Sequence, residues 1–187
     1  MPRDQPSAES GDPADELFDV VDLEDRVIGQ ERRSVVHARG LAHRAVHIFV
    51  FNSRGQLLVQ RRSALKDEFP LTYTSSASGH VGAAETYEEC APRELKEEIG
   101  LEAPLEWIVK LPPSPETANE QTVLFRTVSD AIPTPNENEV ASLTYFTLDE
   151  LSALLSADPG AFSPPFATLL RWYLAKGHGK AAPQESA

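Results

Sequence analysis

The chain lacks the features that mark secreted and membrane proteins. It has a single cysteine, Cys90, among 187 residues, so no disulfide can form within it, which is typical of a reducing cytoplasm. No stretch approaches 18 consecutive apolar residues, so we expect no membrane span. The first residues, MPRDQPSAES, contain no apolar segment of the kind that a secretory signal requires. The sequence therefore predicts a cytoplasmic protein.

Positive charge is also scarce. The chain carries 17 lysines and arginines against 29 aspartates and glutamates, a net charge of −12. Such a surface repels the nucleic-acid backbone, so we expect no binding to long DNA or RNA. An acidic protein can still bind a small phosphate compound where it gathers a few Arg or Lys side chains, or holds a metal between carboxylates. A functional site should therefore lie where such groups cluster.

The length suits one domain. Residues 1–15 are rich in Pro, Ser, Asp and Gly, and residues 177–187 have a similar composition, so we predict a disordered tail at each end. The single domain then spans 16–176. Strands are expected at 17–22, 26–31, 45–52, 56–62, 105–111, 121–128 and 140–146. Many strands with few helices that do not alternate indicate an α+β fold, in which helices pack against a mixed sheet.

Three helices are expected from their start signals. Thr86 with Glu89 forms a capping box that opens a helix over 86–99, and Gly100 follows it in the usual C′ position. Thr147 with Glu150 forms a second capping box before a short helix. Ser163 followed by Pro164 starts a third helix, whose apolar residues recur at helical spacing.

The chemistry is carried by the segment GHVGAAETYEECAPRELKEEIGL at 79–101. Glu94, Glu97 and Glu98 fall at i, i+3 and i+4 of the predicted helix, so their carboxylates share one face. Like charges placed this way destabilise a bare helix, and Mg²⁺ resolves the repulsion because it prefers carboxylate oxygens. Arg93 lies four residues before Glu97 and can pair with it. Gly79 permits a close backbone approach in the preceding loop.

This segment resembles the Nudix box at every fixed position: a glycine, then a glutamate, an Arg-Glu pair, an apolar residue, a Glu-Glu pair, a glycine and a final apolar residue. The resemblance implies a Nudix fold, a mixed sheet sandwiched by helices in three α/β/α layers. It also implies hydrolysis of a diphosphate linkage with Mg²⁺ or Mn²⁺, with Arg93 and the three helix glutamates as catalytic residues. The metal ligands implied are Glu94, Glu97, Glu98 and the carbonyl of Gly79.

One residue departs from an ordinary helix. Pro92 lies inside the predicted box helix, where it removes the hydrogen bond to Glu88 and should kink the first turns. The three carboxylates come after it, so we expect the site to survive.

The stretch QLLVQRRSALKDEFPLTYTSSASGHV at 56–81 resembles isopentenyl-diphosphate isomerase, a Nudix-fold enzyme that does not hydrolyse its substrate. Arg62 and Lys66 match the two cations that contact the diphosphate in that family, and the alternative is that they are ordinary surface charges. Ser78 stands where the isomerase has its catalytic cysteine, and a hydroxyl is a far weaker acid than a thiol. The intact box and the missing cysteine together favour hydrolysis on an isomerase-like scaffold.

Further candidates come from the same resemblance and from strand ends. His43, His80 and Glu120 fall where the isomerase places ligands of its own metal site. Both histidines are candidates for contact with substrate, and the alternative is a structural, hydrogen-bonded role. Glu120 and Glu139 lie near strand starts, where each could be an extra metal ligand, the general base or a solvated side chain.

Three functions remain open. The first is hydrolysis of a small nucleoside-diphosphate-type or related compound, the second is isomerisation of a prenyl diphosphate, and the third is non-catalytic binding of a diphosphate. The segments 31–44, 112–120 and 130–138 are expected to select the substrate. By analogy with other Nudix proteins, a homodimer is a further expectation.

Overall fold

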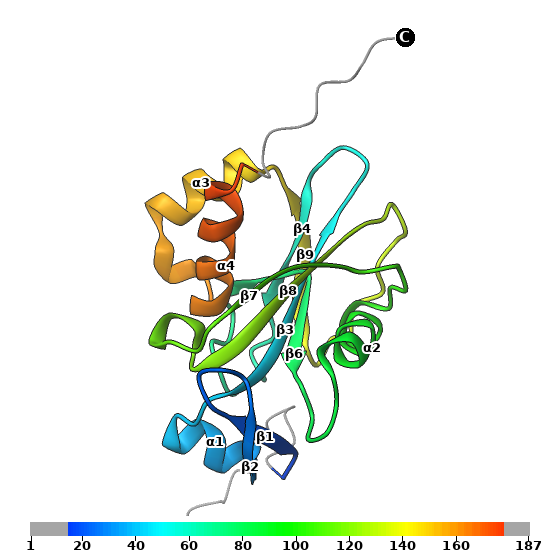
Figure 1. Ribbon diagram of the computed structural model, residues 1–187. Coiled ribbons are helices and arrows are strands. Elements are labelled where there is room, and N and C mark those ends of the chain that lie inside the picture. The colour runs from blue at the N-terminus through cyan, green and yellow to red at the C-terminus, as the bar shows by residue number, and fades with distance from the viewer. Residues whose placement is uncertain (1–14, 178–187) are drawn as a thin grey trace, which may run out of the picture.

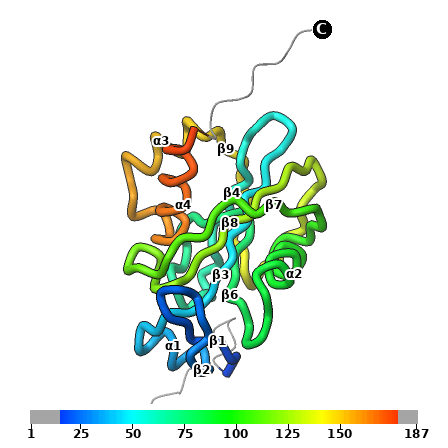
Figure 2. The backbone as a smooth tube through the Cα atoms, in the orientation of Figure 1, coloured from blue at the N-terminus to red at the C-terminus, as the bar shows by residue number. Residues whose placement is uncertain are grey.

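A mixed β-sheet forms the centre of the computed structural model, which describes residues 15–177. Five strands follow the order β5-β4-β3-β8-β7, while β6 pairs with β3 and β9 pairs with β4. Their bounds are Tyr73–Thr74 (β5), Leu57–Arg62 (β4), His43–Phe51 (β3), Glu120–Val128 (β8), Glu106–Leu111 (β7), Ala77–His80 (β6) and Val140–Phe146 (β9). Strands β3 and β8 run parallel and the other pairs are antiparallel, so the sheet is mixed. Figure 2 shows these two strands lying side by side through the middle of the molecule.

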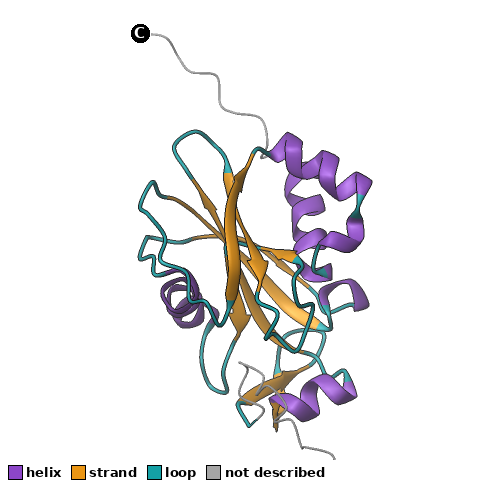
Figure 3. Cartoon of the chain, turned by 180° about the vertical axis from the view of Figure 1, so that it is seen from behind, coloured by secondary structure: helices purple, strands orange, loops and turns teal. Residues whose placement is uncertain are grey.

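Helices cover both faces of this sheet (Figures 1 and 3). Helix α2 (Tyr87–Ile99) packs on one face, and helices α3 (Leu148–Ala157) and α4 (Pro164–Ala175) pack on the other. Strand β3 contributes side chains to the hydrophobic cores on both faces of the sheet, because successive side chains point to opposite faces. Val46 and Ile48 belong to the core beneath α2, whereas Phe49 belongs to the core beneath α3 and α4. The expected three-layer arrangement is confirmed.

The start and end of α2 follow the sequence signals. The Thr86 hydroxyl accepts from the Glu89 amide, the Glu89 side chain accepts from the Thr86 amide, and Gly100 has a left-handed φ of 68°. Pro92 lies inside the helix, which runs without interruption from Tyr87 to Ile99. Because Pro92 and Glu88 are both exposed, water can replace the hydrogen bond that proline removes.

An N-terminal unit lies beside one end of the sheet (Figure 1). It consists of the hairpin β1 (Leu17–Val21) and β2 (Val27–Arg32), followed by helix α1 (Arg33–Arg39). Asp25, in the hairpin turn, ties this unit to the domain: its carboxylate accepts from Arg44 Nε at 2.7 Å, from Lys110 Nζ at 2.7 Å and from the Tyr87 hydroxyl at 3.1 Å. These contacts link the hairpin to β3, β7 and the first residue of α2.

Most predicted elements are present, with small shifts at their ends. Helix α1 was not predicted, because it lies in the segment 31–44 that we treated as a loop, and strands β5 and β6 are too short to show a pattern. The two 3₁₀ turns, Pro115–Thr117 and Pro159–Ala161, were also not predicted. Apart from Asp15 and Gly177, the predicted tails lie outside the described residues. Within residues 15–177, no helix has the length and apolarity that crossing a bilayer requires.

Candidate functional site

The three box carboxylates project from α2 at different depths. The buried face of α2, which includes Ala91, Leu95 and Ile99, packs the helix against the sheet. Glu98 is buried and its Oε2 accepts a hydrogen bond from the Ser78 amide at 3.0 Å. The side chain of Glu94 is 13% exposed and that of Glu97 is 58% exposed. The set thus reaches from the interior of the domain to the solvent.

Arg93 contacts three carboxylates, two of which, Glu94 and Glu97, belong to the box set. Its Nε and Nη2 donate to the two oxygens of Glu85, at 2.8 and 2.9 Å. Its Nη1 donates to Glu94 at 2.7 Å and to Glu97 at 3.0 Å. The predicted pairing with Glu97 is present, and the contacts to Glu85 and Glu94 add to it. One guanidinium therefore fixes the orientation of three carboxylates, for which its planar set of donors is well suited.

The deeper two carboxylates lie where a negative charge is unfavourable. Burial raises the pKa of Glu98 to about 8, and the nearby charge of Glu94 adds to this. Burial also raises the pKa of Glu94 to about 7, against the opposing effect of Arg93. A divalent cation would compensate both charges, so the donor set fits Mg²⁺ or Mn²⁺, which favour carboxylate oxygens.

These shifts predict how stability depends on pH. Between pH 4.5 and about 7 to 8, Glu94 and Glu98 keep a proton in the folded state that the unfolded chain has lost, so stability falls as pH rises. Each pH unit over which one such carboxyl holds its proton only when folded costs about 1.4 kcal/mol, roughly 3 °C in melting temperature. We expect the metal-free protein to melt at a lower temperature at pH 8 than at pH 5.5. Added Mg²⁺ should remove most of this decline in thermal unfolding scans; an equal decline with and without Mg²⁺ would contradict the assignment.

Gly79 faces this carboxylate set from strand β6. A Cβ at this position would overlap the carboxylate of Glu94, so the predicted close approach is present. We expect Gly79→Ala to fold but to displace that carboxylate, lowering metal-dependent activity by at least about tenfold. Gly29→Ala is a matched control because a Cβ at Gly29 meets no atom within 4 Å. Unchanged activity in Gly79→Ala would show that the position of Glu94 is unimportant.

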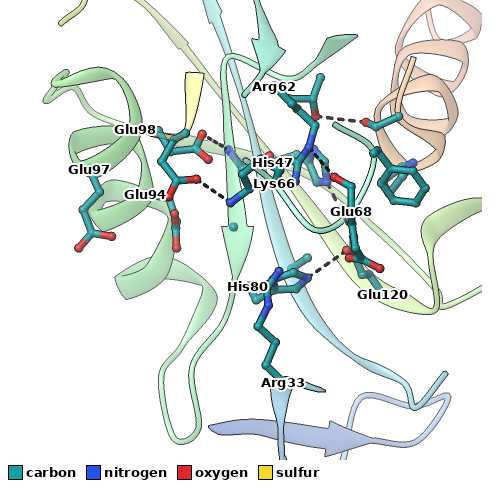
Figure 4. A pocket seen from close by; sticks show the side chains of 18 of the residues that line it. Arg33, His47, Arg62, Lys66, Glu68, His80, Glu94, Glu97, Glu98 and Glu120 are labelled. Atoms are coloured by element: carbon teal, nitrogen blue, oxygen red, sulfur yellow. Dashed lines mark hydrogen bonds and ion pairs between the residues drawn. The ribbon is translucent and has the colours of Figure 1, made fainter. Parts of the chain in front are cut away.

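A cavity of about 420 Å³ lies between the box helix and the N-terminal unit (Figure 4). It collects ten of the side chains or backbone positions singled out from the sequence: Arg62, Lys66, Gly79, His80, Arg93, Glu94, Glu97, Glu98, Glu120 and Glu139. The side chains of Lys66 and Glu139 form an ion pair of 2.6 Å. Arg62 uses its Nε to donate to the carbonyl of Glu68 at 3.1 Å. His43 is not among the lining residues; it is buried beside them.

A second cluster of possible metal ligands lies next to the cavity. His37, His43 and His80 each offer a nitrogen within 4.8 Å of the others. Burial lowers the pKa of His80 to about 3 and that of His37 to about 4, so both rings are neutral near pH 7, as a metal ligand must be. The buried Nε2 atoms of all three rings have no hydrogen-bond partner among the described residues. Those of His37 and His43 are therefore available to a cation, whereas that of His80 lies 3.4 Å from Glu120 Oε1.

His80 is already engaged in this arrangement. Its Nδ1 lies 3.1 Å from Nη1 of the buried Arg33, and its Nε2 lies 3.4 Å from Glu120 Oε1. Because arginine can only donate, the neutral ring keeps its proton on Nε2, toward Glu120. A metal at the histidine cluster would have to displace one of these contacts, whereas the glutamates of α2 present acceptor oxygens directly.

The lining or neighbouring residues that were not predicted include four with titratable or cationic side chains: Arg33, His37, His47 and Glu68. Arg33 and His37 lie on the unpredicted helix α1. His47 could have been found, because it shares one face of strand β3 with His43. Glu68 lies in the loop after β4, where burial and the charge of Glu120 raise its pKa to about 7.

Comparisons with known proteins show which family the chain resembles. The NUDIX domain family matches residues 41–173. An uncharacterised Nudix hydrolase of Streptomyces coelicolor is 47% identical over 46% of this chain and 48% of its own length, so the chain matches about half of that relative. An isopentenyl-diphosphate Delta-isomerase of Photorhabdus laumondii is 32% identical over 83% of this chain and 91% of its own. A prenyl-diphosphate phosphatase of Methanosarcina mazei is 32% identical over 79% and 89%.

A solved structure extends the likeness to three dimensions. A protein of Deinococcus radiodurans has 32% sequence identity and a TM-score of 0.75, over 84% of this chain and 98% of its own. The family match covers more than half of the chain and includes the whole of helix α2 with its carboxylates. This chain therefore belongs to the Nudix family and has its fold, with relatives among both the hydrolases and the isopentenyl-diphosphate isomerases.

Proposed function

We propose that the chain hydrolyses the diphosphate linkage of a small compound with the help of Mg²⁺ or Mn²⁺. The observation that carries this proposal is the shared cavity, where the box carboxylates of α2 face Arg62 and Lys66. The carboxylates supply ligands for a hard cation, and the two cationic side chains suit the phosphate oxygens of the same substrate.

The roles of the residues follow from their positions. The metal would be held by Glu94, Glu97, Glu98 and the carbonyl of Gly79. Arg93 would fix the orientation of the Glu94 and Glu97 side chains through its hydrogen bonds. When bound, such a metal polarises a phosphoryl oxygen and lowers the pKa of a water molecule. Arg62 and Lys66 bind and orient the phosphates, which is most of what a protein contributes to phosphoryl transfer. A glutamate of the helix accepts the proton of the attacking water; the oxygen–phosphorus bond forms as the bridging bond breaks.

The lining of the cavity bears on the substrate class. Its apolar lining residues are Ala45, Phe69 and Pro165, and the aromatic rings that line it are those of Phe69, His47 and His80. A nucleobase would find one phenyl ring and two imidazoles, and a long prenyl chain would find little apolar surface. The named relatives include an enzyme of prenyl diphosphates, so short prenyl diphosphates belong in the test beside nucleoside derivatives.

The test is a substrate panel with purified protein. Nucleoside diphosphate sugars, dinucleotides, nucleoside triphosphates and short prenyl diphosphates are each incubated with and without Mg²⁺, and release of the phosphate-bearing products is measured. Metal-dependent cleavage of one class supports the proposal and identifies the substrate class. Conversion of isopentenyl diphosphate to its isomer without phosphate release would favour the isomerase alternative. Metal and diphosphate binding with no turnover across the panel would favour a binding module.

A further inference from the structure

We propose that Glu139 determines how strongly the site distinguishes a diphosphate from a monophosphate, by competing with the ligand for Lys66. This inference rests on the proposed function, since it takes the cavity to be the diphosphate site. It assigns Glu139 a role in specificity, in place of the role as base or metal ligand considered from the sequence.

The Lys66–Glu139 pair is short and largely shielded from water. The Nζ and Oε2 atoms are 2.6 Å apart, and the two side chains are 10% and 20% exposed. The backbone holds the partners together as well: the Ser63 amide donates to the Glu139 carbonyl at 2.9 Å, next to the loop that carries Lys66. An ion pair with so little solvent around it is screened weakly, so a ligand must offer Lys66 a stronger partner to replace Glu139.

The side chain of Arg62 is only partly engaged in hydrogen bonds. Its Nε donates to the Glu68 carbonyl, while Nη1 and Nη2 have no partner among residues 15–177. The cavity thus offers an arginine whose paired donors are available and a lysine that is already engaged. Figure 4 shows both side chains directed into the same space between the box helix and Glu68.

This difference should separate the two ligand classes. A single phosphoryl group can be bound by Arg62 through two parallel hydrogen bonds, without disturbing Lys66. A diphosphate has a second phosphoryl group and more negative charge, so it can also take Lys66 from Glu139. After cleavage, each product with one phosphoryl group competes poorly for Lys66, and the return of Glu139 favours product release. Specificity then arises partly from a competing internal carboxylate.

The experiment compares binding of methylenediphosphonate, which resists cleavage, with binding of inorganic phosphate by calorimetry in Mg²⁺. The variants are Glu139→Gln and the control Glu137→Gln, whose side chain is exposed two residues earlier. Glu139→Gln should gain affinity for phosphate by about tenfold, or about 1.4 kcal/mol, and gain less for the diphosphonate. The ratio of the two dissociation constants should therefore fall, while Glu137→Gln keeps the wild-type ratio.

Other results would overturn the proposal. An unchanged ratio in a folded Glu139→Gln protein means that Glu139 does not compete for Lys66. A loss of Mg²⁺ affinity in that variant means that Glu139 is a metal ligand. If Glu139→Gln does not fold, Glu139→Asp, with its shorter reach to Lys66, must show the same direction of change. If Arg62→Met and Lys66→Met both leave diphosphonate binding unchanged, the diphosphate site itself is misplaced, which separates failure of the proposed function from failure of this inference.

Discussion

A Glu98→Gln variant should melt at a higher temperature than the wild type in the absence of metal, while losing at least about 10²-fold in Mg²⁺-dependent turnover. The stability gain is expected because Glu98 is buried and its pKa is raised to about 8, so at pH 8 or above the variant replaces an unfavourable carboxylate by a neutral amide. Glutamine keeps an oxygen that can accept from the Ser78 amide. The loss of activity is expected because an amide oxygen is a poorer ligand for a hard cation.

The matched control is Glu88→Gln, an exposed glutamate on the same helix. It should change neither the melting temperature nor turnover appreciably. Thermal unfolding at pH 8.5 with EDTA and turnover with Mg²⁺ are measured on the same preparations. A Glu98→Gln protein that keeps its activity would remove this residue from the metal site, and one that melts lower would contradict the unfavourable burial of its charge.

The second large effect is expected for Arg93→Met. This change removes six hydrogen bonds: two to Glu85, and one each to Glu94, Glu97, the His80 carbonyl and the Cys90 sulfur. It also leaves the carboxylates crowded without their cation. The Arg93 side chain is 34% exposed, so solvent should limit the loss of stability to about 1–3 kcal/mol. Turnover should fall by about 10- to 100-fold, because the carboxylates lose their common orientation.

Arg93→Lys separates charge from geometry. Lysine keeps the positive charge but cannot donate in two fixed directions, so it should recover part of the stability and little of the turnover. The exposed Arg171 on α4, far along the chain from the box, provides an arginine-to-methionine control. If lysine restores full turnover, a positive charge alone is sufficient and the planar donors are unimportant.

The box helix could be predicted because its determinants are local. The cap at Thr86, the end at Gly100 and the i, i+3, i+4 spacing of the glutamates all lie within one short stretch, and each is present as expected. The apolar run of β3 and the two other helix starts are similarly local patterns. Pro92 does not end the helix, because proline removes only one hydrogen bond while the capping box and the packing on the sheet remain.

What escaped prediction depends on contacts between distant segments. The Lys66–Glu139 pair joins residues 73 positions apart, and Asp25 collects partners as far away as Lys110. Helix α1 has only seven residues, of which two adjacent ones, Val35 and Val36, are β-branched, so no helical pattern marked it. Missing that helix also hid Arg33 and His37, which reach the site from it. Their place in the site is set by the packing of the hairpin and α1 against the end of the sheet, which no local sequence pattern encodes.

Metal-assisted hydrolysis is tested most directly by the source of the oxygen that enters the product. Once the panel has identified a substrate, a single turnover in ¹⁸O-labelled water with Mg²⁺ should place one labelled oxygen in one phosphate-bearing product, and EDTA should abolish the reaction. Glu98→Gln should leave the substrate intact under the same conditions. Conversion of the substrate without incorporation of label, or labelled product that forms equally well without a divalent metal, would contradict metal-assisted hydrolysis at the box helix.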